Sequence, residues 1–159
     1  MKKKILGSLV ACSLLTTAIY ANEDNNTSKK YGMGISIGSS SNIVRLPIDM
    51  SNDMRLEPYI GFKFNDNDYG SSTNVQAGIA LEKMYTIESN LKGYYGAFLG
   101  VESYSGGETT TSAALGPIIG AEYYLNDKFC IGAEVRINAI LGDTTTVETD
   151  TSALIRYYF

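Results

Sequence analysis

Charged residues of opposite sign recur two positions apart along this chain, and they are the residues whose chemistry needs explaining first. Arg55 and Glu57 form one such pair, and Glu134 and Arg136 form another. Side chains two residues apart in an extended strand point to the same face of a sheet. The members of each pair therefore share a face, and opposite charges confined there are expected to pair. The sequence does not fix which acid pairs with which base.

The composition offers few of the residues on which enzyme catalysis commonly depends. Histidine is absent from the 159 residues, so no Ser–His or Asp–His arrangement can activate a nucleophile or a water molecule. Residues 66–70 (DNDYG) partly resemble a calcium-binding loop, but the ligand at position five and the bidentate glutamate are missing. Cys130 is expected to fill space and not to react. We predict that the protein is not an enzyme and uses no cofactor or metal.

The first 21 residues are typical of a secretory signal peptide. Three lysines at positions 2–4 precede a mostly apolar run over residues 5–20, and Ala21 is followed by polar residues, so we expect cleavage after Ala21. Residues 9–12 (LVAC) resemble a lipoprotein cleavage site. However, the apolar run continues past Cys12, which favours an ordinary signal peptide. Residues 22–30 are polar and are expected to form a periplasmic lead.

The charge of the exported chain bears on its partners. Losing the three leader lysines lowers the basic residues from 13 to 10 against 17 acidic ones, so the net charge falls from −4 to −7. An acidic chain without a basic run argues against nucleic acid as a partner. Beyond residue 21, no apolar run approaches the roughly 20 residues of a transmembrane helix.

Residues 31–159 alternate between apolar and polar side chains with a period of two, which predicts β-strands throughout. Short turns rich in Asn and Asp, near residues 52, 89 and 127, alternate with polar loops at 65–72, 105–111 and 142–150. Transmembrane barrels have short turns at one end and longer loops at the other. We predict an all-β fold, an eight-stranded antiparallel up-and-down transmembrane β-barrel, with strands over residues 31–38, 44–50, 54–64, 74–85, 92–104, 113–125, 129–141 and 151–159.

The two faces of the predicted strands differ too much for a soluble fold. One face is apolar in nearly every strand, whereas the other carries Gly, Ser and charged residues that cannot build an apolar core. In a barrel with its apolar face toward lipid, the charges fill the lumen. The reverse would expose Arg55 and Lys63 to lipid, at about 2–4 kcal/mol per basic residue at the midplane. The predicted lumenal charge network contains Arg45, Asp49, Arg55, Glu57, Lys63, Glu82, Glu102, Glu122, Glu134, Arg136 and Arg156.

The tight turns also predict the register of the hairpins. Centring each hairpin on its turn repeatedly places a large lumenal side chain opposite glycine or alanine, as the narrow interior of an eight-stranded barrel requires. The predicted opposite pairs are Asp49 with Arg55, Glu82 with Gly96, Ala80 with Phe98, Glu122 with Gly132, and Glu134 with Gly120.

The last strand ends on Phe159, with Tyr157 two residues before it and Ile155 before that. Together with residues 116–124 (GPIIGAEYY) and 132–134 (GAE), this ending resembles the small bacterial outer-membrane β-barrels of OmpA/OmpX type. The resemblance implies integral location in the outer membrane of a Gram-negative cell, contact with its lipid, and insertion by the barrel assembly machinery. It also implies that Ile155, Tyr157 and Phe159 form the assembly signal.

Family members that bind host surfaces use long or protruding outer strands, and the sequence predicts none here. The tyrosine pairs 94–95, 123–124 and 157–158 are interpreted as interfacial girdle residues. We predict a monomeric structural or surface barrel with a lumen plugged by side chains. A small diffusion channel, related to porins, is the alternative.

Overall fold

A computed structural model describes residues 30–39, 41–51, 53–67, 70–106, 109–142 and 144–159. The predicted signal peptide and the lead as far as residue 29 lie outside this part of the chain. No helix among the described residues has the length and hydropathy to cross a membrane. The strands are β1 (Gly32–Gly38), β2 (Asn42–Arg45), β3 (Ile48–Asp49), β4 (Met54–Asn67), β5 (Gly70–Glu88), β6 (Leu91–Ser105), β7 (Thr109–Asn126), β8 (Phe129–Leu141) and β9 (Thr146–Tyr158).

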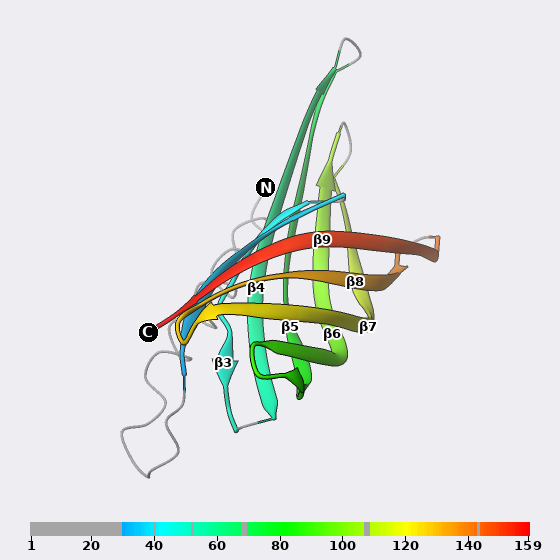
Figure 1. Ribbon diagram of the computed structural model, residues 1–159. Helices are drawn as coiled ribbons and strands as arrows, with labels where there is room; N and C mark the ends of the chain where they lie inside the picture. The colour runs from blue at the N-terminus through cyan, green and yellow to red at the C-terminus, as the bar shows by residue number, and fades with distance from the viewer. Residues whose placement is uncertain (1–29, 40, 52, 68–69, 107–108, 143) are drawn as a thin grey trace.

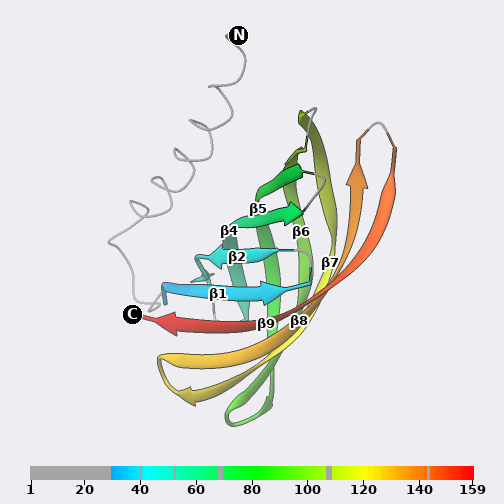
Figure 2. The same cartoon turned by 90° about the horizontal axis from the view of Figure 1, so that it is seen from above.

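The described strands form a closed antiparallel barrel with eight strand positions. Strands β2 and β3 both pair with β4 and together fill one of these positions. The strand is interrupted at Leu46 and Pro47 because proline has no N–H to donate to the ladder. Neighbouring strands pair in sequence from β4 to β9, and β9 then pairs with β1. Strand β1 pairs with β2, which closes the ring (Figures 1 and 2). This confirms the predicted fold class.

The closing seam joins the two ends of the barrel sequence over its full length. It runs from Gly32 opposite Tyr158 to Gly38 opposite Ser152. Beyond the last strand, the Phe159 N–H donates to the Tyr31 carbonyl at 2.9 Å. The end of the chain is therefore tied to its neighbour, as a membrane barrel without free edges requires.

The register predicted from the tight turns is confirmed. All five predicted pairs, including Glu134 opposite Gly120 and Glu82 opposite Gly96, are cross-strand partners. Glycine is required where neighbours come this close, because a Cβ on Gly96 would strike the Leu81 carbonyl oxygen. A Cβ on Gly116 would similarly strike the carbonyl oxygen of Ile137.

The outer face of the barrel is apolar, as the alternation predicts. Exposed apolar side chains occur at every strand position around the barrel, among them Ile35, Leu99 and Ile119, each more than half exposed. Charged side chains of the same strands are buried in the lumen. In water this surface would be a large exposed apolar patch of the kind that marks a membrane contact.

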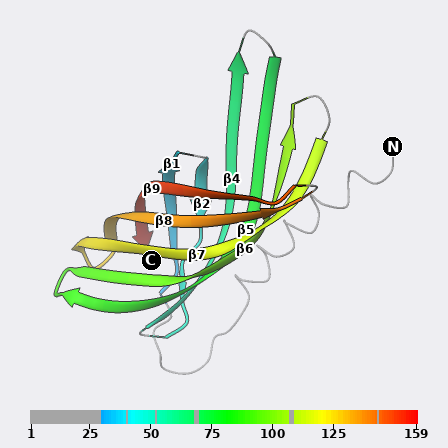
Figure 3. The ribbon, with the colours of Figure 1, turned by 90° about the vertical axis from the view of Figure 1, so that its right-hand side faces the viewer.

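Two hairpins extend beyond the rest of the barrel, contrary to the prediction from sequence. Pairing of β4 with β2 stops at Phe62, yet β4 continues to Asn67, paired only with β5. Strand β7 likewise begins at Thr109, before its pairing with β8 begins at Ala113. Figures 1 and 3 show β4–β5 standing well above the rim, with β6–β7 beside it. The expectation of polar loops at 65–72 and 105–111 was wrong for their described residues. Ladder hydrogen bonds join backbone groups, so polar segments rich in Ser and Thr also extend strands.

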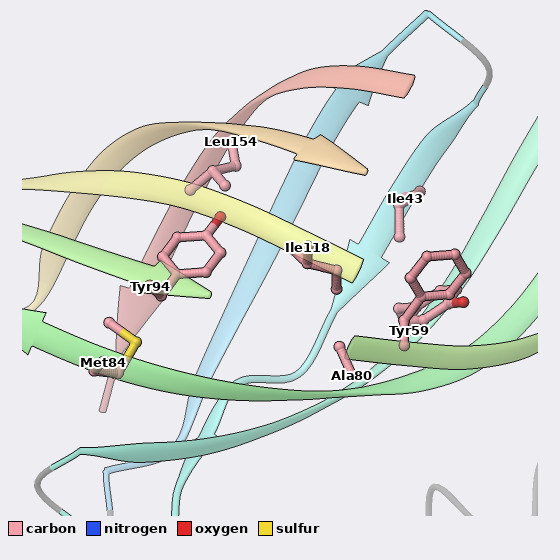
Figure 4. Packing of buried hydrophobic residues seen from close by; sticks show 8 residues of the cluster. Ile43, Tyr59, Ala80, Met84, Tyr94, Ile118 and Leu154 are labelled. Atoms are coloured by element: carbon pink, nitrogen blue, oxygen red, sulfur yellow. The ribbon is translucent and has the colours of Figure 1, made fainter. Parts of the chain in front are cut away.

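The lumen also contains an apolar cluster that the polar interpretation of its face overlooked. Figure 4 shows Ile118 between Tyr94 on one side and Tyr59 on the other. The cluster consists of Ile43, Tyr59, Ala80, Met84, Tyr94, Phe98, Ile118 and Leu154. The girdle interpretation is wrong for one tyrosine of each pair. Tyr94 and Tyr158 are at most 1% exposed, and Tyr124 faces the same interior, whereas Tyr95, Tyr123 and Tyr157 lie on the outer face. Adjacent strand residues must point to opposite faces.

Candidate functional site: the lumenal charge network

Eight of the buried charged side chains in the described structure, four arginines and four glutamates, form a network across the lumen. Each is at most 4% exposed. They come from six strands and point inward because their apolar neighbours in sequence face outward. Within this set the positive and negative groups are equal in number, so each buried ion has opposite charge nearby, as ions removed from water require. The eight are Arg45, Arg55, Arg136, Arg156, Glu57, Glu82, Glu122 and Glu134.

Glu134 on β8 is the most heavily bonded acid of the network. Arg45 donates to its two oxygens, from Nη1 at 2.9 Å and from Nη2 at 2.7 Å. Arg136 donates from Nε at 2.6 Å, and the Tyr94 hydroxyl donates at 2.9 Å. Paired contacts between guanidinium and carboxylate are the strong form of this interaction, so Glu134 fixes β2 against β8 across the lumen.

A second group lies nearer the tight turns. Arg55 contacts Glu122 at 2.8 Å, Asp49 at 3.0 Å and Glu82 at 3.4 Å. Arg156 on the closing strand contacts Glu57 at 2.7 Å and Glu82 at 3.8 Å, and also pairs with Glu122. Because Glu57 pairs with both Arg45 and Arg156, the two groups form one continuous network.

Aromatic rings pack against the guanidinium planes and fill the space that remains. Arg136 lies over the rings of Tyr59, at 4.9 Å from its centroid, and of Phe98, at 5.3 Å. Arg156 lies over Tyr94 at 5.4 Å. Such contacts between cations and aromatic rings add to the ion pairs where water is excluded. Charged groups and the aromatic rings packed against them therefore fill this part of the lumen together.

Two residues of the predicted network do not join it. Lys63 and Glu102 form no ion pair among the described residues, and they lie nearer the loop end of the barrel, where β4–β5 and β6–β7 protrude. Glu102 instead accepts a hydrogen bond from Asn74 Nδ2. Asp49 does join, through Arg55, although its side chain is 26% exposed. Lumenal charges are spaced evenly along the strands in the sequence, so the sequence could not show that the network occupies only the part of the lumen nearer the tight turns.

Several residues of the site were missed. Asp150 is 4% exposed and accepts from the Ser39 hydroxyl at 2.6 Å, but the sequence placed it in a loop. Ser36 accepts from Arg45 Nε at 3.0 Å, and Tyr94 donates to Glu134. All three lie on the lumenal face, as the alternation of side chains between the two faces of a strand dictates. This alternation was the sequence signal that could have identified them.

Three carboxylates of the network, those of Glu57, Glu82 and Glu134, come within 4.8 Å of one another. A metal ion could use such a group, but each acid already contacts arginine. Guanidinium groups thus occupy the positive positions around this cluster. The arrangement is suited to locking strands together across a closed lumen.

The C-terminal residues lie on the outer face of the seam. Ile155, Tyr157 and Phe159 are 46%, 45% and 72% exposed, and the Tyr157 and Phe159 rings meet at a centroid distance of 5.8 Å. Their role as an assembly signal stays a prediction.

A closed ring of eight antiparallel strands, apolar outside and charged inside, is the fold of the eight-stranded outer-membrane β-barrels. Solved structures of this class match the chain. The Neisserial surface protein A matches with a TM-score of 0.65 and 20% identity, over 82% of this chain and 94% of that one. The N-terminal β-barrel domain of Pseudomonas aeruginosa OprF gives 0.55 and 16%, over 82% and 96%. The Yersinia pestis outer membrane protein Ail, in a phospholipid bilayer nanodisc, gives 0.53 and 14%, over 83% and 100%.

No protein-family model matches the sequence, and no curated protein matches it either. At these identities the structural matches speak for the fold alone.

Proposed function

We propose that the protein is an integral outer-membrane barrel with a structural or surface role, whose lumen is closed by side chains. The single observation that carries this proposal is the continuous network of four arginines and four glutamates across the lumen. An eight-stranded barrel encloses an interior only wide enough to be filled by side chains. Here that interior is filled by ion pairs that would have to break before a solute could pass.

The protruding hairpins support a surface role. Strand β4 extends past its pairing with β2, and β7 past its pairing with β8. The described residues near the tips of the two hairpins are mostly polar, including Asn, Asp, Ser and Thr. This removes the objection, raised by the predicted short loops, to a host- or partner-facing surface. The matching Neisserial protein is a surface protein, which agrees with such a role.

The proposed partners are outer-membrane lipid, around the apolar face, and the barrel assembly machinery, at the C-terminal strand. Export by the signal peptide and a monomeric state belong to the same proposal. A small diffusion channel is the alternative, and catalysis is not proposed because the chain has no histidine.

The orientation can be tested in intact cells with a membrane-impermeant maleimide. Ser105→Cys places a thiol at the exposed end of β6, and Asp127→Cys places one in the exposed β7–β8 turn. Native Cys130 is buried and serves as the unreactive background. We expect Ser105→Cys to be labelled in intact cells and Asp127→Cys only after permeabilisation. Equal labelling of both in intact cells, or of neither, would refute a surface-facing loop end.

A further inference from the structure

Lys83 is the one basic residue of the described strands that points away from the lumen. It lies on β5, and its cross-strand partners are Met54 on β4 and Tyr95 on β6. Cross-strand partners share a face, and Tyr95 is 52% exposed on the apolar outer surface. A basic side chain on a lipid-facing surface is costly at the bilayer midplane and tolerated near the interface. Lys83 therefore indicates where the lipid head groups lie at the tight-turn end of the barrel.

Asp53 lies beside Lys83 without forming a hydrogen bond to it. The Lys83 Nζ and Asp53 Oδ2 atoms are 4.0 Å apart, too far for a hydrogen bond, and the two side chains are 54% and 56% exposed. Asp53 is held in place because the Ser51 hydroxyl donates to its Oδ1 at 2.9 Å and the Met84 N–H donates to its backbone oxygen at 2.7 Å. A positive and a negative group are thus fixed side by side, and both are accessible to a ligand.

The groups around Lys83 follow the order of the parts of a phospholipid. Leu81, which is 45% exposed, lies on the same face of β5, on the side of Lys83 toward the middle of the barrel. Asp53 precedes the start of β4 at Met54, in the β3–β4 connection at the end of the barrel opposite the protruding β4–β5 hairpin (Figure 1). From the bilayer outward, an apolar surface is therefore followed by a positive group and then by a negative one. Phosphatidylethanolamine carries the complementary groups in that order, which are its acyl chains, its phosphate and its primary ammonium.

Two tyrosines complete the outer surface around Lys83. Tyr85 and Tyr95 are 46% and 52% exposed, and their ring centroids are 6.3 Å apart. The Tyr85 ring lies against Gly93, where a Cβ would strike it. Tyrosine suits the membrane interface because its ring is apolar and its hydroxyl bonds to polar groups. The two rings therefore offer contacts to the glycerol region of a lipid, and their hydroxyls offer donors to its phosphate oxygens.

Charge and hydrogen bonding discriminate between lipid head groups at this surface. Phosphatidylglycerol would suit Lys83, but it has no positive group for Asp53, which would repel its negative charge. Phosphatidylcholine has both charges, but its quaternary ammonium has no N–H to donate to a carboxylate, and charge-assisted hydrogen bonds are the strong ones. We propose that Lys83 and Asp53, flanked by Tyr85 and Tyr95, bind the head group of one phosphatidylethanolamine molecule. This inference rests on the proposed location in a membrane and goes beyond it by naming a lipid partner.

Nuclear magnetic resonance of the labelled barrel in phosphatidylcholine nanodiscs tests the proposal. Phosphatidylethanolamine and phosphatidylglycerol with the same acyl chains are added in turn, and the backbone amide resonance of Lys83 is followed. We expect phosphatidylethanolamine to shift this resonance saturably and to reach half-saturation at a lower mole fraction than phosphatidylglycerol. The absence of a saturable shift with phosphatidylethanolamine, or half-saturation by phosphatidylglycerol at an equal or lower mole fraction, would overturn the proposal.

Insertion is measured separately, from the migration of unboiled protein on a denaturing gel. Inserted protein without the lipid preference would refute the head-group site alone. Protein that does not insert would contradict the proposed membrane location, and the head-group site with it.

Removing the carboxylate alone separates the two halves of the proposed site. Asp53→Asn leaves Lys83 in place, so the preference for phosphatidylethanolamine over phosphatidylglycerol, taken as the ratio of their half-saturation mole fractions, should fall about two- to fivefold, the equivalent of one exposed charge pair. Asp127→Asn makes the same change in the exposed β7–β8 turn and should keep the wild-type preference. An equal preference in the two variants would show that Asp53 does not bind the ammonium group and would overturn the proposal.

Discussion

Replacing Glu134 by glutamine removes one negative charge from the lumen while keeping the shape of the side chain. The carboxylate accepts four hydrogen bonds, two from Arg45, one from Arg136 and one from Tyr94. Glutamine offers one carbonyl oxygen and turns an NH2 group toward guanidinium donors. The variant therefore leaves buried positive charge without its partner, and no cavity is created to confuse the measurement.

The expected loss follows from how much of the network survives. Breaking a buried ion pair by removing one partner costs about 3–5 kcal/mol. Arg45 keeps Glu57 at 2.8 Å, and glutamine retains some hydrogen bonding. We therefore expect the lower end of that range, about 3 kcal/mol. In the double variant Arg45→Gln, Glu134→Gln, the loss should be smaller than the sum of the two single losses, because residues in one network do not act additively.

Urea unfolding of the barrel in lipid vesicles, followed by far-ultraviolet circular dichroism, measures these differences. The chain has no tryptophan, so the backbone signal is the suitable probe. Lys83→Met is the matched control, because the Lys83–Asp53 pair is 4.0 Å long and more than half exposed, and such pairs contribute about 0–1 kcal/mol. A Glu134→Gln variant as stable as Lys83→Met would refute the claim that lumenal ion pairs hold the barrel together.

Three further predictions follow from the closed seam and the tight packing. Folded and boiled protein should migrate differently on a denaturing gel, whereas identical migration together with solubility in the absence of detergent would contradict a membrane barrel. Deletion of Phe159, which ties the seam to Tyr31, should lower the amount of barrel in the outer membrane, and wild-type levels in membrane fractions would remove its proposed role in assembly. Gly116→Val should reduce the folded fraction on the same gel, because its Cβ would strike the Ile137 carbonyl oxygen; Ser112→Val on the same strand, where a Cβ is already present, is the control.

The alternation of side chains between the two faces of each strand made most of the fold predictable from the sequence. Once apolar residues were assigned to lipid, the period of two placed Arg45, Glu57 and Glu134 in the lumen and Ile155 outside. Turn chemistry near residues 52, 89 and 127 set the register, and the opposite pairs such as Glu134 with Gly120 match the ladder. Both signals are local and strong because a slip of one residue reverses every side chain.

What the sequence could not provide depends on the third dimension. The choice of Arg156 as partner of Glu57 depends on which strands face each other across the barrel, and the two residues are far apart in the chain. The height of β4 and β7 was underestimated because polar residues outside an apolar belt show no alternation of hydrophobicity. The lumenal position of Phe98 was assigned, but its role as a ring beneath Arg136 required the folded barrel.

Single-channel conductance of the refolded, unmodified protein in a planar bilayer tests the central claim most directly. A lumen crossed by the Arg45–Glu134, Arg156–Glu57 and Arg55–Glu122 pairs should carry no steady current, and bilayers containing the protein should match protein-free bilayers. A steady conductance on the nanosiemens scale would contradict the closed lumen and would establish the diffusion channel instead.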